Sequence, residues 1–275
     1  MTISPDGKRA VSDSTARNII LWDLASGQAI YTLSGHSSSV RSVEISFDGK
    51  CVISASADTT LILWDLNSGQ AIHTLSGHSG SVRSVALSPN EKRAVSASDD
   101  TTLILWDLVS GQAIHTLSGH SDAVYSVAIS PDGKHAVSAS ADKILILWDL
   151  TSRQAIHNPS GHRRFVSSVA ISPDGKHAIS ASDDTTLILW NLASGKAIHT
   201  LSGHSNAVRA VAISLDGKYA VSASCDTTLF LWDLTSGQAI HTLFGHSNAV
   251  YSVAISPDGK YAVSASDDKT LILLC

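Results

Sequence analysis

The chain has 275 residues, of which 43% are hydrophobic and 16% are charged, and its formal net charge is −5. Its 19 Lys and Arg residues are spread thinly, which argues against a nucleic-acid partner. The longest apolar runs are far too short to span a bilayer, and no apolar leader precedes the first charged residues. We therefore expect a cytoplasmic protein with no membrane partner.

Two residue patterns recur along the chain at a constant interval. Residues 59–100 and 101–142 agree at 33 of 42 positions without a gap. The tryptophans, each 42 residues after the last, are Trp22, Trp64, Trp106, Trp148, Trp190 and Trp232. A Gly-His pair recurs at the same interval, with its histidines at His36, His78, His120, His162, His204 and His246. A fixed period of this length is typical of an array of supersecondary units.

Each unit contains four short runs rich in Val, Ile, Leu, Ser and Thr, and none has a helical period. In the second unit these runs cover 40–46, 51–56, 60–66 and 70–76. The segments between them carry Gly or Asp, as tight turns require. The pattern predicts a four-stranded antiparallel meander in every unit. A single such sheet cannot bury both faces, so the units must stack, and radial closure into a β-propeller hides most edges.

The shared pattern "GH…V.SVAISPDGK.AVSAS.D.TLILWDL" resembles the WD-repeat family of β-propellers, in the style of prokaryotic and fungal arrays of near-identical repeats. The resemblance covers essentially the whole chain and implies a hydrogen-bond network within each blade. In the second blade the network would join His36, Ser54 or Ser56, Asp58 and Trp64. The matching sets in the following blades are His78/Asp100/Trp106, His120/Asp142/Trp148, His162/Asp184/Trp190 and His204/Asp226/Trp232.

The first and last units depart from this pattern. The first has Trp22 but Ala16 at the Asp position and no Gly-His pair before it, and the last has Leu274 where Trp belongs. We expect these end blades to be the least stable. Loss of one network histidine is predicted to cost roughly 1–3 kcal/mol.

Seven full units of 42 residues would need 294 residues, which is 19 more than the chain has. We therefore predict an all-β, seven-bladed propeller in which the closing outer strand of the last blade is missing. In the family an N-terminal segment usually supplies that strand, so we expect a piece of a longer protein or an open edge that a donated strand would pair with. The predicted domain is 1–275, with approximate blades 1–34, 35–76, 77–118, 119–160, 161–202, 203–244 and 245–275.

Histidine, serine and aspartate in one repeat are also the components of a hydrolase triad. A triad needs a single exposed nucleophile, an oriented base and an oxyanion hole, whereas this trio recurs in five blades and is each time accompanied by Trp. The pattern favours a structural role, and we expect no catalytic residue and no enzyme activity.

The other histidines and the cysteines do not form a metal-binding pattern. Five histidines share one position of the outermost strand, and His135 and His177 begin the second strand of adjacent blades. Members of each set lie on different blades, so we expect no metal site and no cofactor. Cys51, Cys225 and Cys275 stand at unrelated spacings, which are not those of a disulfide framework or a zinc site.

Variation between the copies concentrates just after each Gly-His pair. In a WD-repeat fold these residues lie on the top face around the central channel, and Arg and Tyr are favoured at binding hot spots. Lys143 and Lys269 of neighbouring loops add charge to this face. The candidate partner-binding residues are Arg41, Arg83, Tyr125, Arg163, Arg164, Phe165, Arg209 and Tyr251. Drift between duplicated copies would also produce such variation at solvated loops.

We therefore predict a non-catalytic scaffold that binds a protein or peptide, with an acidic segment or a peptide carboxylate as the expected ligand. It would be the sensing or adaptor part of a larger signalling protein. The alternative is a lectin-like or small-ligand-binding propeller with one weak site per blade, which requires a uniform top face. The opposite face, built from PDGK and SGQ turns, is nearly uniform, and we expect less selectivity there.

Overall fold

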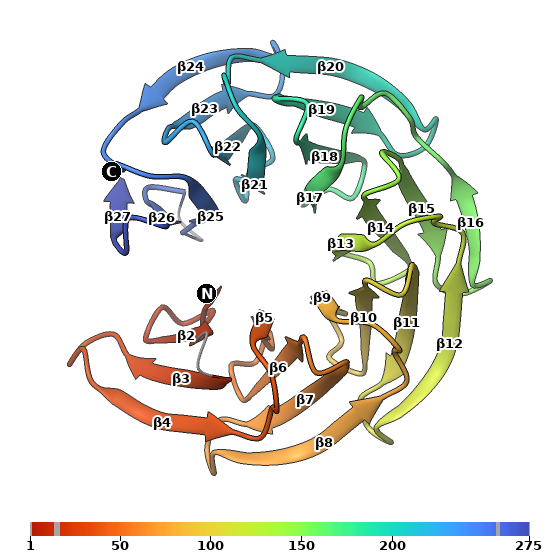
Figure 1. Ribbon diagram of the computed structural model, residues 1–275, viewed down its shortest axis with the longest axis vertical. Helices are drawn as coiled ribbons and strands as arrows, with labels where there is room; N and C mark the ends of the chain where they lie inside the picture. The colour runs from red at the N-terminus through yellow and green to blue at the C-terminus, as the bar shows by residue number, and fades with distance from the viewer. Residues whose placement is uncertain (1, 14–16, 257–258, 275) are drawn as a thin grey trace. The chain divides into compact units, whose positions relative to one another are not determined.

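The computed structural model describes residues 2–13, 17–256 and 259–274 of the chain (Figure 1). In these ranges all regular secondary structure is β-strand, so no helix that could cross a membrane is present there. The chain divides into two compact units, Met1–Ile129 and Ser130–Cys275. We refer to them as unit 1 and unit 2.

Unit 1 contains three four-stranded sheets, which we call blades 1, 2 and 3, followed by the first strand of blade 4. Each blade takes four consecutive strands, and we label these a, b, c and d. The strands are β1 (Thr2–Ile3), β2 (Arg9–Asp13), β3 (Asn18–Asp23), β4 (Ala29–Ser34), β5 (Val40–Ile45), β6 (Cys51–Ser56), β7 (Thr60–Asp65), β8 (Gln70–Ser76), β9 (Val82–Leu87), β10 (Arg93–Ser98), β11 (Thr102–Asp107), β12 (Gln112–Ser118) and β13 (Val124–Ile129).

Unit 2 contains the remaining strands of blade 4 and the whole of blades 5, 6 and 7. Blades 5 and 6 have four strands each, whereas the described residues of blade 7 form three. The strands are β14 (His135–Ser140), β15 (Leu145–Asp149), β16 (Gln154–His157), β17 (Val166–Ile171), β18 (His177–Ser182), β19 (Thr186–Asn191), β20 (Lys196–Ser202), β21 (Val208–Ile213), β22 (Tyr219–Ser224), β23 (Leu229–Asp233), β24 (Gln238–Leu243), β25 (Val250–Ile255), β26 (Ala262–Ser266) and β27 (Leu271–Leu274).

Each complete blade within a unit is an antiparallel meander whose strands follow chain order from one edge to the other (Figure 1). Strands b and c carry Val, Ile, Leu and Ala on both faces and are almost wholly buried, whereas strand d is mostly exposed. A sheet with two apolar faces needs a neighbour on each side. The predicted fold class, an all-β seven-bladed propeller, is confirmed, and the last blade has three strands among the described residues.

The hydrophobic core lies between successive blades. In unit 1, Ile53, Leu61 and Leu75 of blade 2 pack with Val85 and Trp106 of blade 3 in one buried cluster. In unit 2, a matching cluster joins blade 5 to blade 6. The repeat therefore buries its apolar residues by stacking copies, as the sequence predicted.

The histidines of strand d connect each blade to the next one within a unit. Nε2 of His73 lies 3.3 Å from the carbonyl oxygen of Val109, in the c–d turn of the following blade. Equivalent contacts of 3.2 Å join His157 to Ala193 and His199 to Thr235. The histidines of this set for which the contact is described are therefore inter-blade braces, a role that the repeat period alone does not reveal.

Candidate functional site

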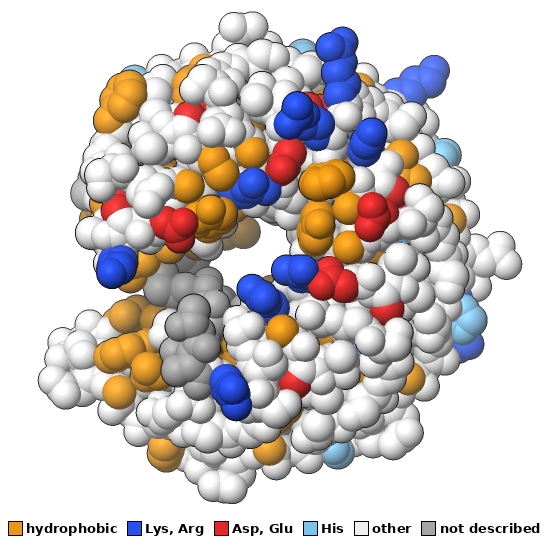
Figure 2. Space-filling model, in the orientation of Figure 1, with side chains coloured by type: hydrophobic (Ala, Val, Ile, Leu, Met, Phe, Trp, Pro, Cys, Tyr) orange, Lys and Arg blue, Asp and Glu red, His pale blue; other side chains and the backbone are white. Residues whose placement is uncertain are grey.

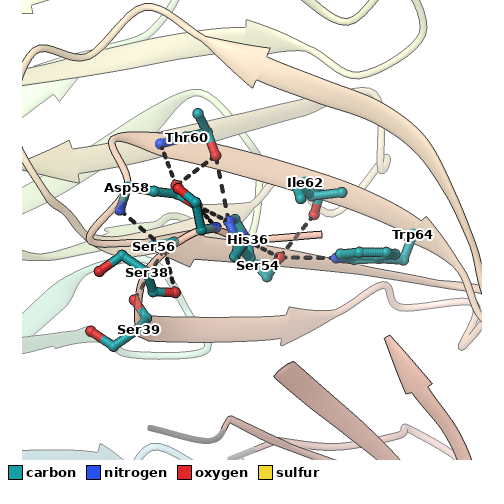
Figure 3. Close-up of polar contacts among 10 residues, drawn as sticks. His36, Ser38, Ser39, Ser54, Ser56, Asp58, Thr60, Ile62 and Trp64 are labelled. Carbon is teal, nitrogen blue, oxygen red and sulfur yellow. Dashed lines mark hydrogen bonds and ion pairs between the residues drawn. The ribbon is translucent and has the colours of Figure 1, made fainter. Parts of the chain in front are cut away.

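Blade 2 contains a complete hydrogen-bond network around one imidazole (Figure 3). Nδ1 of His36 lies 2.9 Å from Oδ2 of Asp58, and Nε2 lies 2.8 Å from Oγ of Ser54. The indole N–H of Trp64 donates to the same Oγ at 2.9 Å. A neutral imidazole with its proton on Nδ1 satisfies all three contacts, since Ser54 then donates to Nε2 and accepts from the indole.

Burial and hydrogen bonding set the charges of this pair. Burial lowers the pKa of His36 below its usual range, and the bond to Asp58 offsets only part of that effect. Burial alone would raise the pKa of Asp58, but the Thr60 hydroxyl, the backbone N–H of Ser37 and His36 outweigh it, and the pKa falls to about 2. The pair therefore holds a neutral imidazole beside a carboxylate.

The serine in this network cannot act as a nucleophile in this arrangement. Ser54 has no exposed surface, and its hydroxyl is engaged by His36 and Trp64. The second serine of the strand, Ser56, instead accepts the backbone N–H of Asp58 at 3.1 Å. The geometry thus distinguishes two serines that the sequence left as alternatives, and it supports the structural interpretation of the trio.

The same geometry recurs in three more blades. Blades 3, 5 and 6 place the histidine within 3.0 Å of both the aspartate and the serine, with the indole N–H on that serine. In blade 4, Trp148 donates to Ser138 at 2.8 Å, whereas His120 and Asp142 belong to different units. In blade 1, Trp22 donates to Ser12 at 2.9 Å, and Ala16 lies outside the described residues.

The loop candidates of unit 1 are arranged around one ion pair. Arg83 makes two hydrogen bonds to Asp99, of 2.7 and 2.8 Å, and its guanidinium lies 5.7 Å from the ring centroid of Tyr125. This pairing and the stacking fix the guanidinium in place. Arg41 is exposed and has no side-chain partner among the residues that the structure describes. The candidates therefore differ in how available their charges are.

A second paired arginine lies in unit 2. Nη1 of Arg209 is 2.7 Å from Oδ1 of Asp183, and its Nε lies 3.2 Å from Sγ of Cys225. Tyr251 is half-exposed, and burial together with the negative charge of Asp267 raises its pKa. The arginine, the tyrosine and their acidic neighbours thus form a mixed-charge surface.

The loop 163–165 of blade 5 is the most exposed of the candidate segments. Arg163 and Arg164 are exposed and make no side-chain ion pair or hydrogen bond in the described part of unit 2, and Phe165 is 43% exposed. Lys143 and Lys269 are exposed in their b–c turns. On the face drawn in Figure 2, basic side chains lie among acidic and apolar ones and form no continuous basic patch.

Sequence analysis did not single out the only two glutamates of the chain, Glu44 and Glu91. Both join blade 2 to blade 3: Glu44 accepts the backbone N–H of Leu87 at 3.0 Å, and Glu91 accepts that of Asp48 at 2.6 Å. Burial raises the pKa of Glu44 to about 8, so its carboxyl group is protonated at neutral pH. The signal was present in the sequence, since five of the other six copies have Ala at the position of Glu44 and blade 1 has Thr2.

Sheets of this topology, repeated with one hydrogen-bond network, define a β-propeller repeat protein. The family model for the WD domain, G-beta repeat, matches residues 27–65, 69–107, 111–149, 153–191, 195–233 and 237–273. The chain therefore belongs to the WD-repeat family, whose propellers are typically non-catalytic scaffolds for protein interaction. A search of curated proteins found no match.

Proposed function

We propose that this chain is a binding platform for a protein or peptide and that it binds through its loop face. The loop face consists of the segments that follow each Gly-His pair: 37–41, 79–83, 121–125, 163–167, 205–209 and 247–251. The observation that carries the proposal is the contrast between a constant buried network and variable, exposed residues in these segments. Scaffolds that bind selectively place variable residues on loops held by a rigid framework.

The charge of the 163–165 segment favours an acidic ligand. In the described part of unit 2, the Arg163 and Arg164 guanidiniums lie on the surface without a carboxylate partner, and Phe165 beside them is partly exposed. An unpaired guanidinium takes a carboxylate in a bidentate geometry, and an adjacent aromatic ring contributes apolar contact. Arg209, which is paired with Asp183 in the same unit, would order the surface beside this contact. The expected ligand is an acidic peptide segment or a C-terminal carboxylate.

The wider role follows from the same features. We infer that the platform is the sensing or adaptor part of a larger cytoplasmic signalling protein. The thinly spread basic residues and the net charge of −5 favour a protein partner over a nucleic acid. Near-identical repeats favour a sensing or adaptor role, because duplication preserves the blade framework while the loop residues vary.

Peptide selection tests this proposal. A phage-displayed peptide library would be selected on the wild-type chain and on Arg163→Ser/Arg164→Asn/Phe165→Ala, which installs the Ser-Asn-Ala loop of blades 6 and 7. We expect acidic peptides that bind the variant at least about tenfold more weakly. The matched control, Arg9→Tyr/Arg93→Tyr, removes two cations at a strand-b position where blades 6 and 7 already carry Tyr. Equal losses in both variants, or no loss in the first, would contradict the proposal.

A second candidate function is a small-ligand-binding propeller with one weak site per blade. The observation that favours it is a cavity that recurs between blades: about 320 Å³ between blades 2 and 3, and about 340 Å³ between blades 6 and 7. Titration calorimetry separates the two functions. Several equal weak sites per chain would favour the ligand-binding alternative, and one site that is lost with the loop variant would favour the peptide platform.

We further propose that a strand from a partner, or from another part of a longer chain, completes blade 7. Leu271 and Leu273 of β27 are 59% and 61% exposed, at positions that strand d covers in the complete blades. A synthetic peptide with the sequence of β8, QAIHTLS, is a suitable probe because it forms the d strand of blade 2. Saturable protection of the β27 amides from hydrogen exchange is expected. No protection at millimolar peptide would contradict it.

A further inference from the structure

Unit 2 contains a cavity of about 430 Å³ between the strands β14–β16 and blade 5. Its volume lies within the range of roughly 300–1,000 Å³ that is usual for small-molecule sites. Leu147, Ile156 and Leu192 supply apolar wall, and His157, which is bonded to the carbonyl oxygen of Ala193, braces one side. Among the described residues that line it, none is a carboxylate. The related cavity between blades 2 and 3 contains Glu91.

A neutral amide replaces an acid in the wall of this cavity. Asn191 stands at the end of strand c, where the other copies with this position described have Asp: Asp23, Asp65, Asp107, Asp149 and Asp233. Oδ1 of Asn191 accepts the backbone N–H of Ser194 at 2.9 Å and its hydroxyl at 3.0 Å. The turn-capping role of the acid is thus retained. The amide NH₂ has no partner among the described residues, which makes it an available donor.

Two imidazoles and an ammonium group complete the polar lining. His135 and His177 begin strand b, at a position where the other blades have Arg, Cys or Tyr. In each, Nδ1 lies 3.9 Å from an aspartate oxygen, of Asp132 and Asp174 respectively. An imidazole donates a hydrogen bond through Nε2 when that nitrogen carries a proton. Lys176 has no described ion-pair partner and lines the same cavity.

We propose that this cavity is a binding site for a small organic anion, a carboxylate or phosphate monoester that carries an apolar group. Asn191, His177 and Lys176 would donate to the anionic head, and Leu147 and Ile156 would contact the apolar part. The proposal does not depend on the peptide-binding loop face. From the sequence we expected little selectivity on the face built from the PDGK and SGQ turns. The residues that distinguish this cavity from its copies, Asn191 and His177, lie at strand ends and not in those turns.

Heteronuclear NMR titration of the whole chain, with phenyl phosphate and benzoate as probes, tests the site. We expect saturable shifts in the amides of 175–177 and 191–194. Binding of phenyl phosphate alone would identify a phosphate site, and binding of benzoate alone would identify a carboxylate site. No saturable shift up to about 10 mM of either probe would overturn the proposal.

The substitution Asn191→Asp restores the residue of the other copies and is therefore expected to fold normally. It should weaken binding of the effective probe at least about tenfold, because it places a carboxylate against the anion. Asp233→Asn makes the opposite change at the same position of blade 6 and is the matched control, with no expected effect on this affinity. Unchanged affinity in Asn191→Asp, or equal changes in both variants, would overturn the proposal.

Discussion

Blades 6 and 7 have closely similar sequences, yet they bury equivalent side chains to very different degrees. Leu229 of blade 6 is 2% exposed, whereas the equivalent Leu271 of blade 7 is 59% exposed. Trp232 is 1% exposed and donates to Ser222, but its counterpart is Leu274, which has no such donor. Within the described residues, blade 6 has a strand d over its c strand and blade 7 has none.

The polar network nevertheless forms in both blades. His246 lies 2.8 Å from both Asp268 and Ser264, distances that match those of His204 in blade 6. The geometry of the histidine, aspartate and serine therefore needs neither the indole nor strand d. The indole and strand d therefore add burial, whereas the d–a loop and the b–c turn by themselves position the network.

Trp232→Leu should have the largest effect on stability, because it gives blade 6 the residue that blade 7 has at this position. The change leaves a cavity in the core between blades 5 and 6 and removes the donor to Ser222. We expect a loss of about 3 kcal/mol in the free energy of unfolding, measured by urea denaturation. Leu274→Trp is the reciprocal variant and should gain less than about 1 kcal/mol, since no described strand covers it. Equal and opposite effects would contradict this account.

His204→Ala and His246→Ala compare the same network with and without the indole. The ring of His204 packs edge-on against Phe230 and Trp232, at centroid distances of 4.5 and 6.3 Å. We expect His204→Ala to cost about 2 kcal/mol and His246→Ala about 1 kcal/mol, as measured by urea denaturation and local hydrogen exchange. His241→Ala, in an exposed position of β24, is the control with no expected effect. A larger cost at His246 would argue against the role given to the indole.

Glu44→Ala extends the comparison of copies to strand a, since five of the other six copies have Ala at this position. Burial raises the pKa of Glu44 from 4.5 to about 8, so the folded chain keeps a proton that the unfolded chain releases. The free energy of unfolding should therefore fall as pH rises through this window. The variant should match the wild type near pH 4 and exceed it by roughly 1–2 kcal/mol at pH 8, measured by urea denaturation. The same difference at both pH values would contradict the assignment.

Thr227→Lys gives the b–c turn of blade 6 the residue of blade 7, and it should have the smallest effect on stability. Thr227 has a φ of 72°, and the equivalent Lys269 of blade 7 has a φ of 68°. A β-branched residue is strained in this left-handed region, and an unbranched one is less so. We expect Thr227→Lys to raise the free energy of unfolding by about 0.5 kcal/mol, seen as a small increase in the urea midpoint. A decrease would indicate that the threonine has another role in the turn.

Most of the fold could be predicted from the sequence because each turn residue recurs at a fixed place. The predicted strands 51–56 and 70–76 coincide with β6 and β8. The choice between Ser54 and Ser56 could not be made from the sequence, because residues two apart in a strand face the same side. The contacts between blades, such as those of His73 and Glu44, could not be predicted from the 42-residue period either. The period shows which residues are equivalent in successive copies, not which residues of two copies are in contact.

The ion pairs of the loop segments could not be predicted from the sequence. Arg83 and Asp99 are 16 residues apart in the chain, and they meet where strands β9 and β10 pair with an irregularity between Ala97 and Ser98. Such a register shift cannot be predicted from a pattern of residue types. Which arginines are paired and which are available therefore became visible only in the structure.

The most direct test of the platform is a calorimetric titration with a peptide selected on the wild-type chain, run on the wild type and on Arg163→Ser/Arg164→Asn/Phe165→Ala. Urea denaturation of both proteins accompanies it. We predict one site, an affinity at least about tenfold weaker in the variant, and free energies of unfolding that agree within about 0.5 kcal/mol. Undiminished affinity in a variant of unchanged stability would contradict the claim that this face binds the partner.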